Sequence, residues 1–99
     1  MEKIHTREVD AFFDAILALN NREECYRFFE DALTVKEILD IAQRLKAAKM
    51  LKNGKSYTEV IAETGMSTAT ISRVSKALER GAGGYDLVIA RVAEGEKND

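Results

Sequence analysis

The sequence of 99 residues contains no proline and no tryptophan, and it has only one cysteine and one histidine. A lone cysteine, Cys25, cannot form an internal disulfide, which excludes a disulfide-stapled secreted scaffold. With a single histidine, His5, a Cys/His zinc site is excluded as well. No apolar run approaches the roughly 20 residues that a membrane-spanning helix needs, and no export-like apolar stretch follows the N-terminus. These absences predict a soluble, cytoplasmic protein that uses no metal or cofactor and does not contact a membrane.

Residues with high helix propensity, such as Ala, Leu, Glu and Lys, are common, and glycine occurs only 6 times. Apolar residues recur at helical spacing, which predicts helices over about residues 7–19, 22–32, 34–53, 57–63 and 68–80. Residues 85–93 fit either a helix or a strand. The polar residues 94–99 are expected to form a disordered tail. We therefore expect one all-α domain over residues 1–93.

The predicted helices begin at residues that commonly cap helices. Thr6, Ser56 and Ser67 each precede a predicted helix, where a side-chain hydroxyl can accept a backbone N–H. Thr34 and Glu37 have the spacing of a capping box at the start of the long helix. Each of these caps indicates where its helix begins.

Charge is distributed unevenly along the chain, although the net charge is only −2. Residues 1–33 carry four Lys/Arg against eight Asp/Glu, residues 34–80 carry nine against five, and residues 81–99 carry two against four. A basic middle segment can bind phosphates despite an acidic isoelectric point; the alternative is that its lysines only solvate a helix surface. Phosphate contact and complementation of the helix dipole both remain open for four lysines at the end of the long helix: Lys46, Lys49, Lys52 and Lys55.

Residues 56–80 have the pattern of a helix-turn-helix. Gly65 permits the left-handed backbone that a tight turn between two short helices requires. We expect Val60 on the first helix to meet Met66, Ile71 and Val74, which would fix the crossing angle between the helices.

The second helix of this motif has small, polar and basic residues on its outward face, which suit entry into a major groove about 12 Å wide. Its cap, Ser67, leaves the N-terminal turn free to approach a phosphate or a base edge. These features predict DNA contacts from Ser67, Thr68, Ala69, Ser72, Arg73 and Lys76. One position departs from the common pattern, since Ile61 stands where many such motifs have a small residue. The alternative is an αα-hairpin with a glycine turn in an ordinary bundle.

The long helix at 34–53 has apolar residues on more than one face, so it needs neighbours on two sides. A chain of 99 residues has few helices with which to cover so wide a surface. This favours a homodimer with the long helix at its centre. An aromatic run fits a core or a dimer interface, with a ligand cage as the alternative; it consists of Phe12, Phe13, Tyr26, Phe28 and Phe29.

Residues 33–80 resemble the Trp-repressor family, and the whole chain resembles the largely uncharacterised YerC/YecD branch of that family. The residues that carry the resemblance are Leu33–Thr34, Arg44, Leu51–Gly54 and Ala69–Arg73. The resemblance implies an all-α subunit of six helices and an intertwined homodimer. It also implies a cytoplasmic transcriptional regulator that binds a palindromic operator.

The ligand pocket of that family is only partly retained. Thr34, Arg44 and Arg73 match the threonine and the two arginines that surround tryptophan in the Trp repressor. Val74, however, replaces a glycine that leaves space for the indole, and Ala77 replaces a serine that helps to hold the amino end of the ligand. A β-branched side chain in a slot for a flat ring overpacks it, at a cost of roughly 1–3 kcal/mol. We therefore expect that tryptophan is not the corepressor; the residues specify no other small-molecule effector.

The base-reading positions also differ from those of the Trp repressor. Tyr57 and Thr58 stand where that protein has polar and basic residues at the start of the first motif helix, and Thr68 replaces an aliphatic residue. Tyr57 and Thr58 are thus added to the candidate DNA contacts. The expected operator differs from the tryptophan operator.

The sequence offers little support for an enzyme. Asp10 and Asp14 could share a helix face, as acid–base pairs do, but no nucleophile motif or glycine loop accompanies them. We therefore predict a non-enzymatic, sequence-specific DNA-binding regulator, favoured as a repressor, whose partners are double-stranded DNA and a second copy of the chain. The alternative is a helical protein-interaction module that docks a partner through residues 85–92 and retains a vestigial helix-turn-helix.

Overall fold

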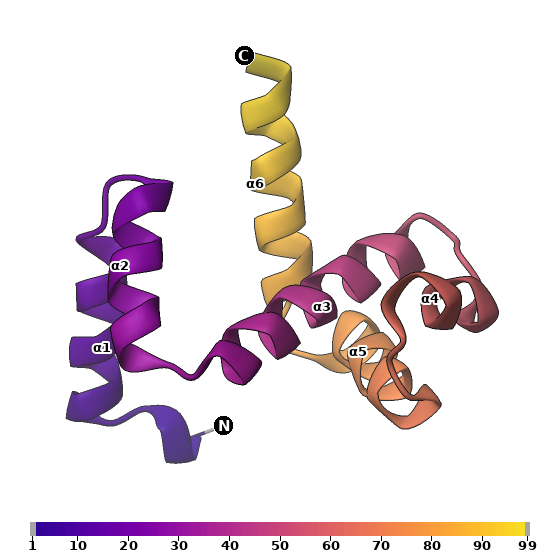
Figure 1. The fold of residues 1–99 in the computed structure, drawn as a ribbon, viewed down its shortest axis with the longest axis horizontal. Coiled ribbons are helices and arrows are strands. Elements are labelled where there is room, and N and C mark those ends of the chain that lie inside the picture. The colour runs from indigo at the N-terminus through magenta and orange to yellow at the C-terminus, as the bar shows by residue number, and fades with distance from the viewer. Residues whose placement is uncertain (1, 99) are drawn as a thin grey trace. The chain divides into compact units, whose positions relative to one another are not determined.

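The computed structural model describes residues 2–98, and within that range the chain forms six α-helices, one 3₁₀ turn and no strand (Figure 1). The elements are the turn Glu2–Ile4 and the helices α1 (Arg7–Leu17), α2 (Arg22–Ala32), α3 (Val35–Lys52), α4 (Tyr57–Thr64), α5 (Thr68–Arg80) and α6 (Gly84–Asn98). The predicted all-α architecture is confirmed. The first five predicted helices agree with the observed ones to within about two residues at each end, which is the usual uncertainty of a helix boundary.

The contacts between helices divide the chain into two compact units, Met1–Ile38 and Leu39–Asp99. The first unit contains α1, α2 and the first turn of α3, and the second contains the rest of α3 together with α4, α5 and α6. The single domain expected over residues 1–93 stays a prediction.

In the first unit, side-chain caps fix where the helices begin. The Thr6 hydroxyl accepts a hydrogen bond from the Val9 backbone N–H at 3.2 Å, as the sequence predicts. At the start of α2, Asn21 Oδ1 accepts from the Glu24 N–H at 2.9 Å, and Glu24 Oε1 accepts from the Asn20 N–H at 2.9 Å. These two bonds satisfy the backbone donors of Asn20 and Glu24 at the boundary between α1 and α2.

Aromatic side chains connect α1 to α2. The ring of Phe12 lies 6.0 Å from that of Phe28 and 6.5 Å from that of Phe29, measured between centroids. The spacings are those of favourable aromatic pairs. Neither α1 nor α2 contains a fully buried residue, and Leu17 is 81% exposed. The first unit therefore has aromatic contacts but no closed core among its described residues.

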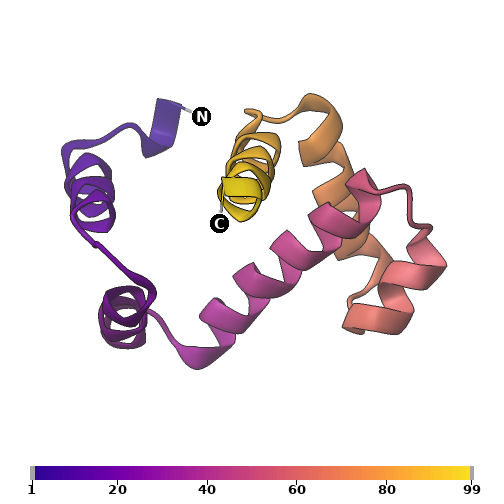
Figure 2. The ribbon, with the colours of Figure 1, turned by 90° about the horizontal axis from the view of Figure 1, so that it is seen from above.

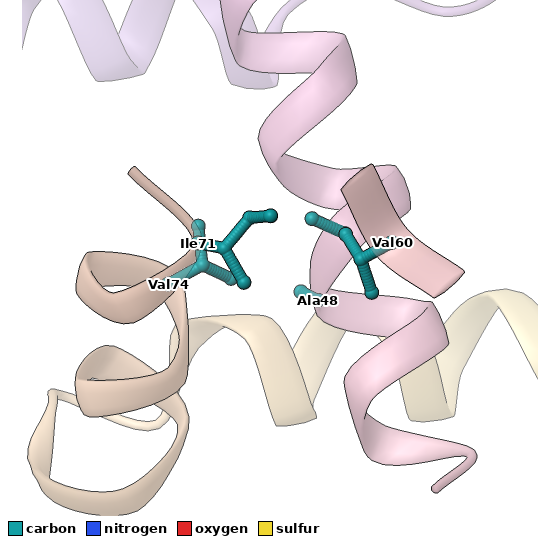
Figure 3. Packing of buried hydrophobic residues seen from close by; sticks show 5 residues of the cluster. Ala48, Val60, Ile71 and Val74 are labelled. Atoms are coloured by element: carbon teal, nitrogen blue, oxygen red, sulfur yellow. The ribbon is translucent and has the colours of Figure 1, made fainter. Parts of the chain in front are cut away.

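In the second unit, α4 and α5 lie beside the C-terminal part of α3 (Figure 1 and Figure 2). Their buried side chains form one cluster, Ala47, Ala48, Val60, Ile71 and Val74 (Figure 3). Partly buried residues pack around it: Met50, Leu51, Met66, Leu78, Tyr85 and Ile89. The predicted meeting of Val60 with Ile71 and Val74 is thus confirmed, with α3 as the surface on which the two helices pack.

The last helix differs from the expectation. Residues 85–93, which fitted either a helix or a strand, are helical, and α6 continues to Asn98 through most of the segment expected to be a disordered tail. Glu and Lys have high helix propensity, and no proline interrupts them, so a polar composition does not prevent the helix from continuing. Asp99 lies outside the described residues.

Candidate nucleic-acid interface

The first helix of the helix-turn-helix begins at a complete capping box. The Ser56 hydroxyl accepts the Glu59 N–H at 3.2 Å, and Glu59 Oε2 accepts the Ser56 N–H at 2.7 Å. The backbone hydrogen bond from Ser56 holds the pKa of the Glu59 carboxyl below its ordinary value, and the nearby charge of Lys55 acts in the same direction. The cap orients the first turn of α4, where Tyr57 and Thr58 are exposed.

The turn between α4 and α5 uses a glycine and a threonine. Gly65 has φ 71°, in the left-handed region, as the sequence predicts, and its N–H donates to the Ile61 carbonyl at 2.8 Å. The Thr64 hydroxyl donates to the Val60 carbonyl at 2.7 Å and accepts the Met66 N–H at 3.2 Å. Sequence reasoning missed this role of Thr64; a hydroxyl residue directly before the turn glycine is the signal that could have found it.

The second helix begins at Ser67, whose hydroxyl accepts the Thr70 N–H at 3.2 Å and lies 3.0 Å from the Thr70 hydroxyl. The predicted capping role of Ser67 is therefore confirmed. Its predicted contact with DNA stays a prediction, and the hydroxyl already has two partners within the protein.

The two faces of α5 have opposite character. Ile71 is fully buried and Val74 is 3% exposed. On the other side, Thr68, Ala69, Arg73 and Lys76 are exposed, and Ser72 is half-buried. None of these outer side chains forms an ion pair with another described residue of the chain. The inner face thus anchors the helix, and the outer face remains available for contact with another molecule.

The lysines near the end of α3 fall into two groups. Lys46 Nζ lies 3.4 Å from Glu63 Oε2 on α4, and Lys52 Nζ lies 2.8 Å from Asp86 Oδ1 on α6. Lys49 and Lys55 make no such pair within the described part of the chain. Two of the four lysines that could contact phosphates are therefore paired with carboxylates of the same unit.

The positions that resemble the tryptophan pocket have different environments. Thr34 caps α3: its hydroxyl accepts the Glu37 N–H at 3.1 Å, and its N–H donates to Glu37 Oε1 at 2.9 Å. These bonds, first that of the Thr34 backbone, lower the pKa of the Glu37 carboxyl. Arg44 and Arg73 are exposed, whereas Val74 is buried in the core cluster and Ala77 is half-buried.

A metal-binding cluster and a membrane-spanning helix are both absent from residues 2–98. No group of three or more His, Cys, Asp or Glu side chains lies in a position to bind a metal ion there. No helix in the same range is long and apolar enough to cross a membrane.

Comparison with known proteins gives consistent results. The Trp repressor protein family matches residues 7–93. The YerC protein of Bacillus subtilis, which is uncharacterised, is 47% identical over 96 residues, covering 97% of this chain and 92% of that protein. A Staphylococcus aureus protein described as a candidate Trp repressor has a crystal structure with TM-score 0.89 and 49% identity, covering 93% of this chain and 92% of that one. A TrpR-like protein of Eubacterium eligens gives TM-score 0.91 and 45% identity, covering 94% and 96% respectively.

Proposed function

The chain belongs to the Trp repressor family, and from this premise we propose that it is a helix-turn-helix transcriptional regulator that represses by binding a specific DNA site. Members of this family bind DNA and are typically dimeric. The observation that carries the proposal is the division of α5 into a buried inner face and an exposed outer face of small, polar and basic side chains.

In this proposal α5 enters the major groove with its outer face toward the bases. Thr68 can form hydrogen bonds to base edges or phosphates, and the Ala69 methyl can contact a thymine methyl. Arg73 and Lys76 supply positive charge at the same surface. Tyr57 and Thr58, at the exposed start of α4, are placed to contact the adjoining backbone, as first helices of this motif do.

Phosphate contacts from the basic residues would provide much of the affinity. Each neutralised phosphate releases counterions, so binding should weaken steeply as salt rises. Because Lys46 and Lys52 are engaged with Glu63 and Asp86, we assign the phosphate-binding role among the α3 lysines to Lys49 and the neighbouring Lys55.

A second copy of the chain completes the proposed regulator. Large apolar side chains remain exposed on α1, α3 and α6, among them Leu17, Leu39 and Val92. Exposed apolar side chains of this size, on each of the two units, are candidates for burial in an interface. A two-fold dimer would place its two recognition helices about 34 Å apart, in successive major grooves of a palindromic site. Acting on DNA in this way is consistent with the cytoplasmic localisation expected from the sequence.

We further propose that tryptophan is not the corepressor. Val74, which stands in place of the family glycine, is buried against the core, so its side chain occupies space rather than leaving a slot. Calorimetric titration with tryptophan should give no binding heat. Stoichiometric binding at micromolar tryptophan would contradict this part of the proposal.

The experiment that tests the function is a selection of random duplexes on the purified protein at moderate salt, without added small molecules. Enrichment of a two-fold symmetric site is the expected result. If no sequence is enriched, either in buffer or in cell extract that supplies unknown small molecules, the proposal of specific DNA binding is wrong.

One observation favours a second candidate, a protein-interaction module that docks a partner through α6. Leu87, Val88 and Val92 on this helix are about half exposed. Deleting residues 84–99 would also remove Tyr85 and Ile89, which pack against the core, so polar substitution of the three exposed residues is the cleaner test. The second candidate would be favoured if the wild-type protein binds a partner protein and this variant does not, while the variant still dimerises and binds DNA.

A further inference from the structure

The joint between α5 and α3, formed by Ile71 and Val74 on one side and Ala47 and Ala48 on the other, has an unequal composition. Both alanines and Ile71 have no exposed surface, and Val74 has 3%. Alanine contributes only a methyl group, so α3 presents a flat surface at this point. The position of α5 on that surface is therefore determined by the bulk of its own two residues together with Val60 of α4, the other large side chain of the cluster.

The outer face of α5 is mechanically linked to this joint. Arg73 directly precedes Val74, and neighbouring residues of a helix point about 100° apart around its axis. Ala69 and Lys76 lie on the same outer face as Arg73, away from Ile71 and Val74. If the joint loses volume, α5 can settle or roll on α3, and every outer side chain moves with it.

Base contacts and phosphate contacts tolerate such movement differently. A side chain that reads a base edge must be held within about 0.5 Å and 10–20° of its working geometry. Phosphate contacts come from long, flexible lysines and arginines, and they carry no sequence information. A displaced α5 would therefore lose affinity for its specific site before it loses affinity for DNA in general.

We infer that Val74 is a positioning residue for DNA specificity: by filling the joint against Ala47 and Ala48, it holds the outer face of α5 in the orientation that reads bases. The side chain acts through the helix and does not itself touch DNA. This inference rests on the proposed function, and it adds that the fixed orientation comes from a protein side chain, without a bound small molecule.

The test compares Val74→Ala with the wild-type protein on two duplexes of equal length, the selected site and a scrambled sequence, at one salt concentration. For the selected site, the Kd should rise about tenfold or more, the effect of losing one good base contact. For the scrambled duplex, the Kd should change by less than about twofold, because the phosphate contacts are kept. The ratio of the two constants is the readout, since simple unfolding lowers both affinities together.

Two further variants separate the shape of the joint from the stability of the fold. Val74→Thr keeps the branched shape, and its hydroxyl can bond to the carbonyl one turn earlier, so the ratio should stay within about twofold of wild type even if the melting temperature falls. Val35→Ala makes the same change as Val74→Ala at a valine in the first turn of α3 that is 73% exposed, and the ratio should not change. If Val74→Ala loses its helical circular dichroism, Val74→Leu, which fills the joint with a different shape, carries the same expectation.

The outcomes distinguish the inference from the function on which it rests. If the wild-type protein selects no site, both fail. If the wild type binds its site specifically and the Val74→Ala protein keeps the same ratio, or loses both affinities in parallel, the inference is wrong and the function stands. A Val74→Thr protein that loses specificity as Val74→Ala does would also contradict it, because shape would then not be the relevant property.

Discussion

Thr64 closes the turn between α4 and α5 with a single hydroxyl that both donates and accepts. Replacing it with valine keeps the shape and removes the bond to the Val60 carbonyl and the acceptor for the Met66 N–H. Because the site is half-buried, we expect Thr64→Val to lower the free energy of unfolding by about 1 kcal/mol or more. Denaturant titration would measure it.

Thr58→Val is the matched control for this substitution, because Thr58 is exposed at the start of α4. Exposed substitutions away from caps and cores usually change stability by less than about 0.5 kcal/mol. Equal effects of the two valine variants would mean that the turn does not depend on the Thr64 hydroxyl.

Glu59 gives the helix-turn-helix a dependence on pH. Its pKa is lower in the folded protein because the carboxylate accepts the Ser56 N–H. A depressed carboxyl pKa contributes stability that is fully present above the unfolded value, about 4.3, and is lost as pH falls through the folded value. Glu59→Gln should therefore flatten the acid side of the curve of melting temperature against pH.

The control for that experiment is Glu79→Gln on α5, which removes an exposed carboxylate that caps no helix. Its curve should keep the acid slope of the wild type. If Glu59→Gln keeps that slope too, the Glu59 carboxylate does not contribute as the capping geometry suggests. Glu37, whose pKa is lowered by the equivalent bonds of Thr34, would then be the group to substitute next.

At the scale of the element, α5 joins two surfaces with different tasks. Arg73→Ala and Lys76→Ala should each weaken DNA binding and leave helix content and oligomeric state unchanged, by circular dichroism and light scattering. A loss of about 1–3 kcal/mol limited to the selected site assigns the residue to a base. A uniform loss, with the salt slope reduced by about one, assigns it to a phosphate.

Lys46→Ala and Lys52→Ala are matched controls because they remove the same charge from lysines that are paired with carboxylates. Their effect on DNA affinity should be small. Weakening equal to that of Arg73→Ala would mean that general charge, rather than the face of α5, determines binding. Loss of helix content in the Arg73 or Lys76 variant would make that residue structural.

Local elements and the packing of Val60 on Ile71 and Val74 within the helix-turn-helix could be predicted from the sequence, whereas contacts between elements farther apart in the chain could not. The caps at Thr6, Ser56 and Ser67 each join residues three apart, so the pattern that predicts them lies within one turn of helix. The pair Lys52–Asp86 joins residues 34 apart, and no sequence pattern specifies it. The burial of Ala47 and Ala48 on α3 could not be predicted either, because apolar residues cover more than one face of that helix.

For the candidate site, the sequence predicted which residues lie on the exposed face of α5, but not the role of each residue. Arg73 and Lys76 are exposed as expected, since helical periodicity separates them from Ile71 and Val74. The contact between the Ser67 and Thr70 hydroxyls was not predicted, although the cap of Ser67 on the Thr70 N–H was. The helical continuation past residue 93 was missed because polar composition was interpreted as disorder, although Glu and Lys favour helices.

At the scale of the whole molecule, the first unit depends on what covers its apolar side chains. Leu17 is 81% exposed and contributes little to its own chain, so Leu17→Glu should leave helix content nearly unchanged. If a second copy buries this residue, the variant should become monomeric by light scattering and bind the selected duplex more weakly. Dimer contacts of a buried leucine are worth about 1.5–3 kcal/mol.

Ala11→Glu, which adds the same charge on another face of α1, is the control and should remain dimeric. A wild-type protein that is itself monomeric would contradict the proposed dimer. A Leu17→Glu protein that stays dimeric would instead mean that other exposed residues, such as Leu39 or Val92, form the interface.

The separation of the two faces of α5 has a consequence for how proteins of this kind diversify. Thr68, Ala69, Arg73 and Lys76 are exposed and outside the core cluster, so exchanging them has little effect on folding. Descendants of one gene could therefore acquire new target sites by substituting a few residues on the outer face of α5, while the residues of the inner face stay unchanged. The same property makes α5 a convenient cassette for engineering, in which a library of outer residues is screened on an unchanged scaffold.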